Sequence, residues 1–118
     1  MSLGDPISVT YNTVAKNLVK INQDSYGSEY YLDDGTERFT VSVKHTIPSK
    51  GAAGESHLVR LDVEHFDAEG ILQRTSSAWT VIKTFDGKQD VNSSQYATEA
   101  LVDFLSDANI AKLVGRES

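Results

Sequence analysis

Cations and small hydroxyls, the groups that bind phosphate and sugar, alternate with apolar residues along the stretch 38–45. This stretch reads Arg-Phe-Thr-Val-Ser-Val-Lys-His. Side chains have a period of two in a strand, so Phe39, Val41 and Val43 are predicted to share one face. The opposite face would carry the polar set, which is Arg38, Thr40, Ser42 and Lys44. Such a face suits contacts with a nucleic acid backbone.

A second stretch, 58–64, repeats the alternation, with Val59, Leu61 and Val63 as its apolar set. Two such strands can form an antiparallel pair with one apolar face and one polar, solvent-exposed face. A plainer explanation competes with nucleic acid binding, because opposite charges often pair across antiparallel strands. In that case the cations Arg38, Lys44, Arg60 and Lys83 would form a solvated face with Asp62 and Glu64. From the residues alone, the solvated face is the favoured explanation.

Residues suited to catalysis or metal binding are sparse. The chain has three histidines and no cysteine, whereas a zinc site needs three or four converging ligands. His45 and His57 are expected to face each other across the loop at Pro48. No nucleophile elbow, P-loop or dinucleotide-binding glycine motif is present, so the chain is not predicted to be an enzyme or to hold a catalytic metal. Calcium could bridge subunits at the loose acidic clusters, which contain Asp5, Asp24, Glu29, Asp33 and Asp34.

The chain of 118 residues has the size of one domain, predicted to span 1–118. Its formal net charge of −6 argues against a generic nucleic acid binder, although a local basic face remains compatible with it. No apolar run approaches the ~20 residues of a membrane helix, and the first residues lack a signal-peptide pattern. The absence of cysteine fits a reducing compartment.

The polar residues would be positioned by strands, which are predicted in the first two thirds of the chain and are followed by helices. Residues 7–11 and 14–21 read as an N-terminal hairpin around Asn12-Thr13, followed by turn residues at 22–27. Further strands are predicted at 29–32, 38–45, 58–64 and 71–85, and helical spacing appears at 97–105 and 110–114. We expect an α+β fold: a hairpin, a five-stranded antiparallel sheet, and two C-terminal helices over its apolar face.

The pattern leaves open whether the helices cover their own sheet or that of a partner. An alternative from another functional class is a monomeric antiparallel-sheet module that holds a small apolar ligand between the sheet and the helices. Such a module would be a species of ~13 kDa, so hydrodynamic size distinguishes it from an assembly of several copies.

Three stretches resemble a known family, the coat proteins of small single-stranded RNA bacteriophages. They are Leu3-Gly4-Asp5, the run 20–32 (Lys-Ile-Asn-Gln-Asp-Ser-Tyr-Gly-Ser-Glu-Tyr-Tyr-Leu) and the tail 112–118 (Lys-Leu-Val-Gly-Arg-Glu-Ser). The resemblance is closest to the Caulobacter RNA phage type, and the order of elements is similar along the whole chain.

This resemblance implies an obligate homodimer whose sheets join edge to edge through the last long strand, with each subunit's helices over the partner's sheet. Dimers would close into a T=3 icosahedral shell around single-stranded genomic RNA. The inner sheet face would bind an RNA hairpin and repress translation of the replicase. The implied location is the virion, assembled in the cytoplasm of a bacterial host. No membrane and no small-molecule substrate is expected as a partner.

The resemblance also assigns residues. Arg60 stands where a lysine contacts phosphate, and Trp79 where an aromatic ring stacks on a base. Leu58 and Val81 depart from the family pattern, which often has threonine and asparagine there. The predicted RNA-binding set is Arg38, Thr40, Ser42, Lys44, Arg60, Ser77, Trp79, Val81 and Lys83. The predicted dimer contacts are Leu101, Phe104, Leu105 and Ile110.

The placement of Trp79 depends on the parity of its strand. One parity of the strand buries Trp79 and Val81, and the other buries Ala78, Thr80 and Ile82. Average behaviour favours burial of a large aromatic residue. Lys83, however, lies on the same face of the strand as Trp79, and burying a charged lysine costs more free energy than leaving it in solvent. Together with the resemblance, this places Trp79 on the polar face.

Overall fold

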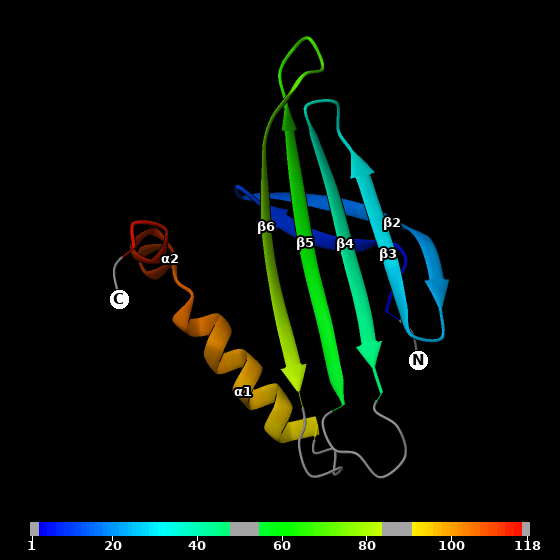
Figure 1. Cartoon of the computed structure of the whole chain (residues 1–118), viewed down its shortest axis with the longest axis vertical. Coiled ribbons are helices and arrows are strands. Elements are labelled where there is room, and N and C mark those ends of the chain that lie inside the picture. Colours follow the sequence, from blue (N-terminus) through cyan, green and yellow to red (C-terminus); the bar gives the residue numbers. More distant parts are fainter. Residues whose placement is uncertain (1–2, 48–54, 84–90, 117–118) are drawn as a thin grey trace.

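The computed structural model describes residues 3–47, 55–83 and 91–116, in a sheet followed by two helices (Figure 1). The six strands are β1 (Ile7–Tyr11), β2 (Val14–Asp24), β3 (Gly27–Asp33), β4 (Glu37–Thr46), β5 (Ser56–Phe66) and β6 (Leu72–Lys83). The helices are α1 (Val91–Phe104) and α2 (Asp107–Val114). The predicted loop at Pro48 and the predicted end of the last strand at Phe85 lie outside the described residues.

Each strand pairs antiparallel with the next one along the chain, in the order β1-β2-β3-β4-β5-β6. The expected count of five strands is therefore wrong, because the sheet has six strands and includes β1 and β2, which pair antiparallel with Tyr11 opposite Val14. The predicted end of the second strand is also wrong, because β2 continues through Asn22–Asp24, residues predicted as a turn. A register shift between Lys20 and Asn22 breaks the alternation there, and the actual turn is confined to Ser25 and Tyr26.

β2 serves two partners. Its first half pairs with β1, with Leu18 opposite Ile7, and its second half pairs with β3, with Val19 opposite Tyr31. The strand bends between these halves, so that β1 and the start of β2 cross the other strands (Figure 1). Tyr11 consequently packs edge-on against Phe39 of β4, with ring centroids 5.2 Å apart. The core lies between the crossing strands and the sheet.

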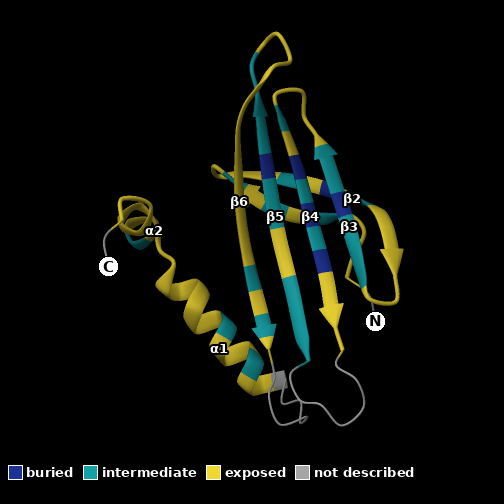
Figure 2. Ribbon diagram, viewed as in Figure 1, coloured by how far each residue is buried: buried dark blue, intermediate teal, exposed yellow. Residues whose placement is uncertain are grey.

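The predicted alternation of β4 is confirmed, since Phe39 is 0% exposed, Val41 4% and Val43 6%. These side chains join Leu18, Tyr30 and Val63 in the buried core. Burial stops short of the last strand: Figure 2 shows buried residues in β2 to β5, while the described residues of β6 and the helices are exposed or intermediate. Burying apolar side chains is the main favourable term in folding, so the single chain leaves much of that term unused.

The two helices lie beside β6 and not over the sheet (Figure 1). Residues 106–109 were predicted to interrupt them, but the break is shorter. Ser106 caps α2, and its side chain accepts a hydrogen bond of 3.3 Å from the backbone N–H of Asn109. Gly115 ends α2. Neither helix is long and apolar enough to cross a membrane.

The chain is much less compact than a self-sufficient domain. Its radius of gyration is 16.6 Å, against about 13 Å for a compact domain of 100 residues. Its accessible surface is 8896 Å², whereas a folded monomer of 12.9 kDa exposes about 6300 Å². The chain therefore exposes roughly 2600 Å² more surface than a compact monomer of its mass.

Candidate nucleic-acid interface

The strand register gathers the predicted RNA-binding residues on one face of β4, β5 and β6. Residues directly opposite each other on neighbouring strands share a face. We use the term polar face for this surface. It consists of Arg38, Thr40, Ser42 and Lys44 of β4, Leu58, Arg60, Asp62 and Glu64 of β5, and Thr75, Ser77, Trp79, Val81 and Lys83 of β6. All nine predicted RNA-binding residues belong to it. Their contact with RNA itself stays a prediction.

The predicted parity of β6 is confirmed. Trp79 lies opposite Arg60 on the polar face, and Ala78 lies opposite Leu61 on the apolar face. The tryptophan side chain is 60% exposed, so it does not belong to the core of the chain. A broad aromatic ring held in solvent on a rigid strand is a platform on which a base can stack.

Four side chains interact at the centre of the polar face. The Arg60 Nε–H donates to both carboxylate oxygens of Asp62, at 3.0 and 3.1 Å. The Arg60 guanidinium carbon lies 5.3 Å from the centroid of the Trp79 ring. The Ser77 hydroxyl, opposite Asp62, also donates to that carboxylate. These contacts lower the pKa of Asp62, through the Ser77 hydrogen bond first and the hydrogen bond and charge of Arg60 after it, against an opposing effect of burial.

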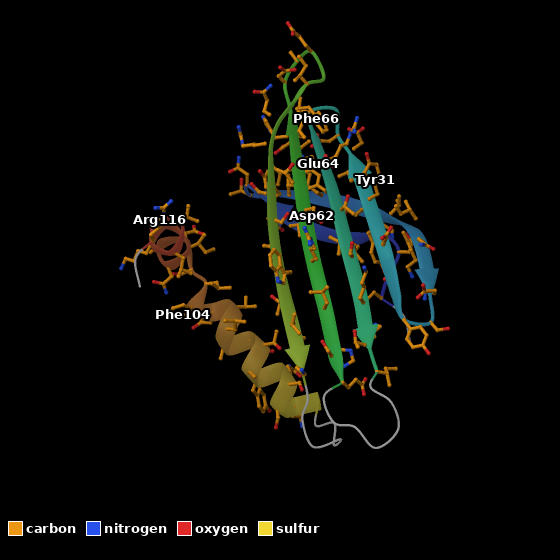
Figure 3. All side chains as sticks on the ribbon, viewed as in Figure 1. Tyr31, Asp62, Glu64, Phe66, Phe104 and Arg116 are labelled. Atoms are coloured by element: carbon orange, nitrogen blue, oxygen red, sulfur yellow. The ribbon has the colours of Figure 1, made fainter. Side chains whose placement is uncertain are left out.

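Near Phe66 the polar face has a similar arrangement around Arg38. The Arg38 Nε lies 3.3 Å from an Asp33 oxygen, and its guanidinium carbon lies 4.4 Å from the Phe66 ring centroid. Asp62, Glu64 and Phe66 follow one another along β5 in Figure 3. The cations were expected to pair across strands with Asp62 and Glu64, and the actual ion pairs differ from this. Arg60 pairs with Asp62 along its own strand, and Arg38 pairs with Asp33 of β3.

Sequence reasoning did not assign Asp62 and Phe66 a place in the site. The signal was available for Asp62, because residues i and i+2 of a strand share a face and Arg60 and Asp62 are spaced in this way. For Phe66 the register shift between His65 and Phe66 hides its position relative to β6.

The half of the polar face near the end of β6 carries the two lysines, Lys44 and Lys83. Lys44 lies opposite Leu58, which lies opposite Val81, and Lys83 lies opposite Ser56. Val81 is 51% exposed. The other half carries the carboxylates of Asp62, Glu64 and Asp33. The chain is acidic overall, yet the surface around Trp79 combines cations with exposed apolar groups, and a phosphate backbone is attracted by local charge.

The carboxylates of the acidic clusters mainly bind backbone N–H groups, at turns for Asp24, Asp33 and Asp34 and on β2 for Asp5. The carboxylates of Asp5, Asp24, Asp33 and Asp34 each accept a hydrogen bond from a backbone N–H, at 2.8 to 3.0 Å. Asp34 also pairs with the Lys16 ammonium at 2.8 Å, which lowers the pKa of Asp34 and raises that of Lys16. Across 3–47, 55–83 and 91–116, no three His, Asp or Glu side chains converge as a metal site. Calcium between subunits stays a prediction.

His45 and His57 lie on the opposite side of the sheet from the polar face. Their Nδ1 atoms are 2.8 Å apart, which confirms that they face each other. Both line a groove of about 710 Å³ together with Leu3, Lys20, Gln23, Asp24, Ser25, Gly27, Ser28, Val43 and Val59. Val59 is 43% exposed there, although it belongs to the apolar set of β5. The groove is therefore lined by residues of β2, β3, β4 and β5.

The predicted dimer contacts are exposed in the single chain. Leu101 is 47% exposed, Phe104 57%, Leu105 37% and Ile110 45%. Phe104 lies at the end of α1, away from the sheet (Figure 3). Within the described residues, β5 is the only strand that pairs with β6, so the other edge of β6 presents its backbone groups without a strand.

The family model described as "Phage phiCb5, coat protein" matches residues 4–85, which hold all of β1 to β6. The chain belongs to this family. A phiCb5-type coat protein has a structural and not an enzymatic role, and the predicted resemblance to RNA phage coat proteins is confirmed. A comparison of the sequence with curated proteins finds no match.

Solved structures confirm the coat protein fold, an antiparallel sheet followed by two C-terminal helices. The virus-like particle of Beihai levi-like virus 21 matches with a TM-score of 0.76 at 14% identity, over 97% of this chain and 95% of that one. The particle of bacteriophage AVE019 gives 0.64 at 12% identity, over 96% and 94%. That of bacteriophage ESE058 gives 0.61 at 13% identity, over 94% of both chains.

Proposed function

We propose that this phiCb5-type coat protein forms interlocked homodimers that assemble into a T=3 icosahedral capsid around a single-stranded RNA genome. The observation that carries the proposal is the β6 edge, which no described strand covers, beside two helices that leave their own sheet. Solved relatives of the same fold come from virus-like particles, which supports assembly into a shell. The protein is accordingly a component of the virion, assembled in the cytoplasm of a bacterial host.

Dimer formation would satisfy three features of the chain together. Two β6 edges pair and lose their exposed backbone groups, which would otherwise be an aggregation hazard. The helices of one subunit lie over the partner's sheet, where the groove beside Val43 and Val59 accepts their apolar side chains. Leu101, Phe104, Leu105 and Ile110 then become buried. The roughly 2600 Å² of excess surface per chain is ample for an obligate interface.

The polar face would point into the shell and bind RNA. Lys44 and Lys83 supply charge, Thr40 and Ser42 supply hydroxyls, and Trp79 supplies a stacking surface. An RNA hairpin presents the phosphates of its stem and the unpaired bases of its loop. The lysines would contact the phosphates, and Trp79 would stack on an unpaired base. If this hairpin lies at the start of the replicase gene, the coat protein bound to it would repress translation of the replicase.

Calcium at subunit contacts remains part of the proposal, with Asp5, Asp24, Glu29, Asp33 and Asp34 as its sources of oxygen.

Size and nucleic acid content test this function on one sample. The protein is expressed in bacteria, purified, and passed over a size-exclusion column with light scattering and absorbance at two wavelengths. Particles in the megadalton range with an absorbance ratio typical of nucleic acid support the proposal. A species of ~13 kDa without RNA would contradict it and favour the monomeric ligand-binding module. Nuclease treatment of intact and disrupted particles establishes whether the RNA lies inside.

A further inference from the structure

Arg60 is held between a carboxylate and an aromatic ring. Its Nε–H donates to both oxygens of Asp62, and its guanidinium carbon lies 5.3 Å from the Trp79 ring centroid. The Asp62 carboxylate is itself fixed by the hydroxyl of Ser77 on β6. The side chain of Asp62 is 25% exposed and that of Arg60 is 47% exposed, so the carboxylate forms the inner part of the pair.

We propose that Asp62 is a specificity-determining residue that ties Arg60 to Trp79 and thereby reserves the guanidinium for an unpaired base instead of a phosphate. The proposal deepens the RNA-binding function above and rests on it. It also changes the role that the resemblance gives to Arg60, which stands where a lysine contacts phosphate.

Charge explains why the tied guanidinium is a poor phosphate ligand. A carboxylate about 3 Å from the guanidinium offsets most of its field at longer range, and it repels an approaching phosphate. The bond to Asp62 also occupies the Nε–H, one donor of the planar fork that would grip a phosphate with two parallel hydrogen bonds. Lys44 and Lys83 lie at the end of the face away from Asp62 and keep the phosphate-binding role.

Stacking explains why the same geometry suits a base. A guanidinium near the face of a tryptophan is attracted to it, and flat bases stack on both groups. A base that is already stacked within a duplex is not available to this cluster. The structure repeats the arrangement at Arg38, which is bound by Asp33 and lies against Phe66, so holding an arginine beside a ring is a recurring feature of this face.

The test compares two neutral substitutions on one strand and one face, Asp62→Asn and the matched control Glu64→Gln. Each removes one negative charge, but among the described contacts of Arg60 only Asp62 is its carboxylate partner. Binding to RNA-free dimers is measured with a single-stranded oligouridylate and with a blunt RNA duplex of equal length, over a range of salt concentrations. The readout is the ratio of the two dissociation constants. A non-specific effect of charge changes both constants by a similar factor and leaves this ratio unchanged.

The wild-type protein is expected to favour the oligouridylate. Asp62→Asn should lower that preference about 2–5-fold, which is the size of an exposed cation–π contact. It should also steepen the salt dependence of duplex binding by about 0.9, as one phosphate contact is gained. Glu64→Gln should leave the ratio unchanged. Ser77→Ala, which loosens the carboxylate without removing it, should shift the ratio in the same direction as Asp62→Asn.

The double variant Arg60→Gln with Asp62→Asn tests whether Asp62 acts through Arg60. In the Arg60→Gln background, adding Asp62→Asn should no longer change the ratio. An unchanged ratio in Asp62→Asn itself, or an equal change in Glu64→Gln, would overturn the specificity role while RNA binding stands. A wild-type dimer that binds neither RNA would overturn the proposed function and this role together.

Discussion

Trp79 and Arg60 lie directly opposite each other on β6 and β5, and the guanidinium carbon is 5.3 Å from the centroid of the indole ring. This pairing puts the only tryptophan of the chain in solvent on the polar face, while its neighbour Ala78 lies on the apolar face beside Leu61. In the proposed function, an unpaired RNA base would stack on this exposed ring.

Replacing Trp79 with alanine is expected to change RNA binding much more than folding. The side chain is 60% exposed, so the free energy of unfolding should change little. The affinity for an RNA hairpin with unpaired bases should fall by about 1–3 kcal/mol, the value of one stacked base. In the wild-type protein, titration with RNA should quench tryptophan fluorescence. A blue-shifted emission that RNA does not quench would show that the ring lies in a dry environment instead.

Neutralising Lys44 and Lys83 together should weaken RNA binding in a salt-dependent way. Each lost phosphate contact removes one released counterion, so the salt slope for single-stranded RNA should fall by about 1.4 for the pair. Arg74→Ala is the matched control, because Arg74 lies opposite His65 on the other face of the same sheet. The assignment of the polar face to the inside of the shell would be wrong if the double variant packaged as much RNA as wild type and bound single-stranded RNA with the same salt dependence.

The apolar residues of α1 should stabilise the dimer and not the single subunit. Leu101→Ala and Phe104→Ala remove side chains that are 47% and 57% exposed in one chain. If the partner buries them fully, each substitution should cost about 2–5 kcal/mol of dimer stability and reduce dimers and particles together. Asp103→Ala, on a different face of the same helix, should have little effect in light scattering and urea unfolding. A stable folded monomer from either apolar variant would argue against the interlocked arrangement.

The pair Lys16–Asp34 should make stability depend on acid. The hydrogen bond from Lys16 is the main reason that the pKa of Asp34 is lowered in the folded chain. The unfolded chain then binds more protons as the pH falls through the ordinary carboxyl pKa of about 4, and the contribution of Asp34 is lost below that value. Asp34→Asn should therefore lower the unfolding temperature at neutral pH and converge with wild type at low pH. Glu69→Gln, at an exposed turn, is the control, and parallel curves for Asp34→Asn and wild type would contradict the assignment.

The sequence predicted best where side chains alternate without interruption. Phe39, Val41 and Val43 were assigned to the core from their period alone, and all three are buried. The facing pair His45 and His57 followed from the positions of two strands around one loop. Prediction failed at β2, because the register shift after Lys20 cannot be read from a pattern of polar and apolar residues.

The site was predicted as a face but not as a set of contacts. The shared parity with Lys83 and the resemblance together placed Trp79 on the polar face, but neither predicts which carboxylate pairs with Arg60. Arg60 takes Asp62 on its own strand because the two side chains are neighbours on one face and Ser77 holds the carboxylate in place. The covering of the apolar face also escaped prediction, since the crossing of β1 over Phe39 depends on the bend in β2.

Cryo-electron microscopy of purified particles tests the central claim most directly. The proposal predicts a closed shell in which β6 pairs with β6 of a second subunit, helices α1 and α2 lie over the partner's sheet, and Trp79 faces density for RNA inside. Particles in which the β6 edge remains unpaired, or in which Trp79 faces the outside of the shell, would contradict it.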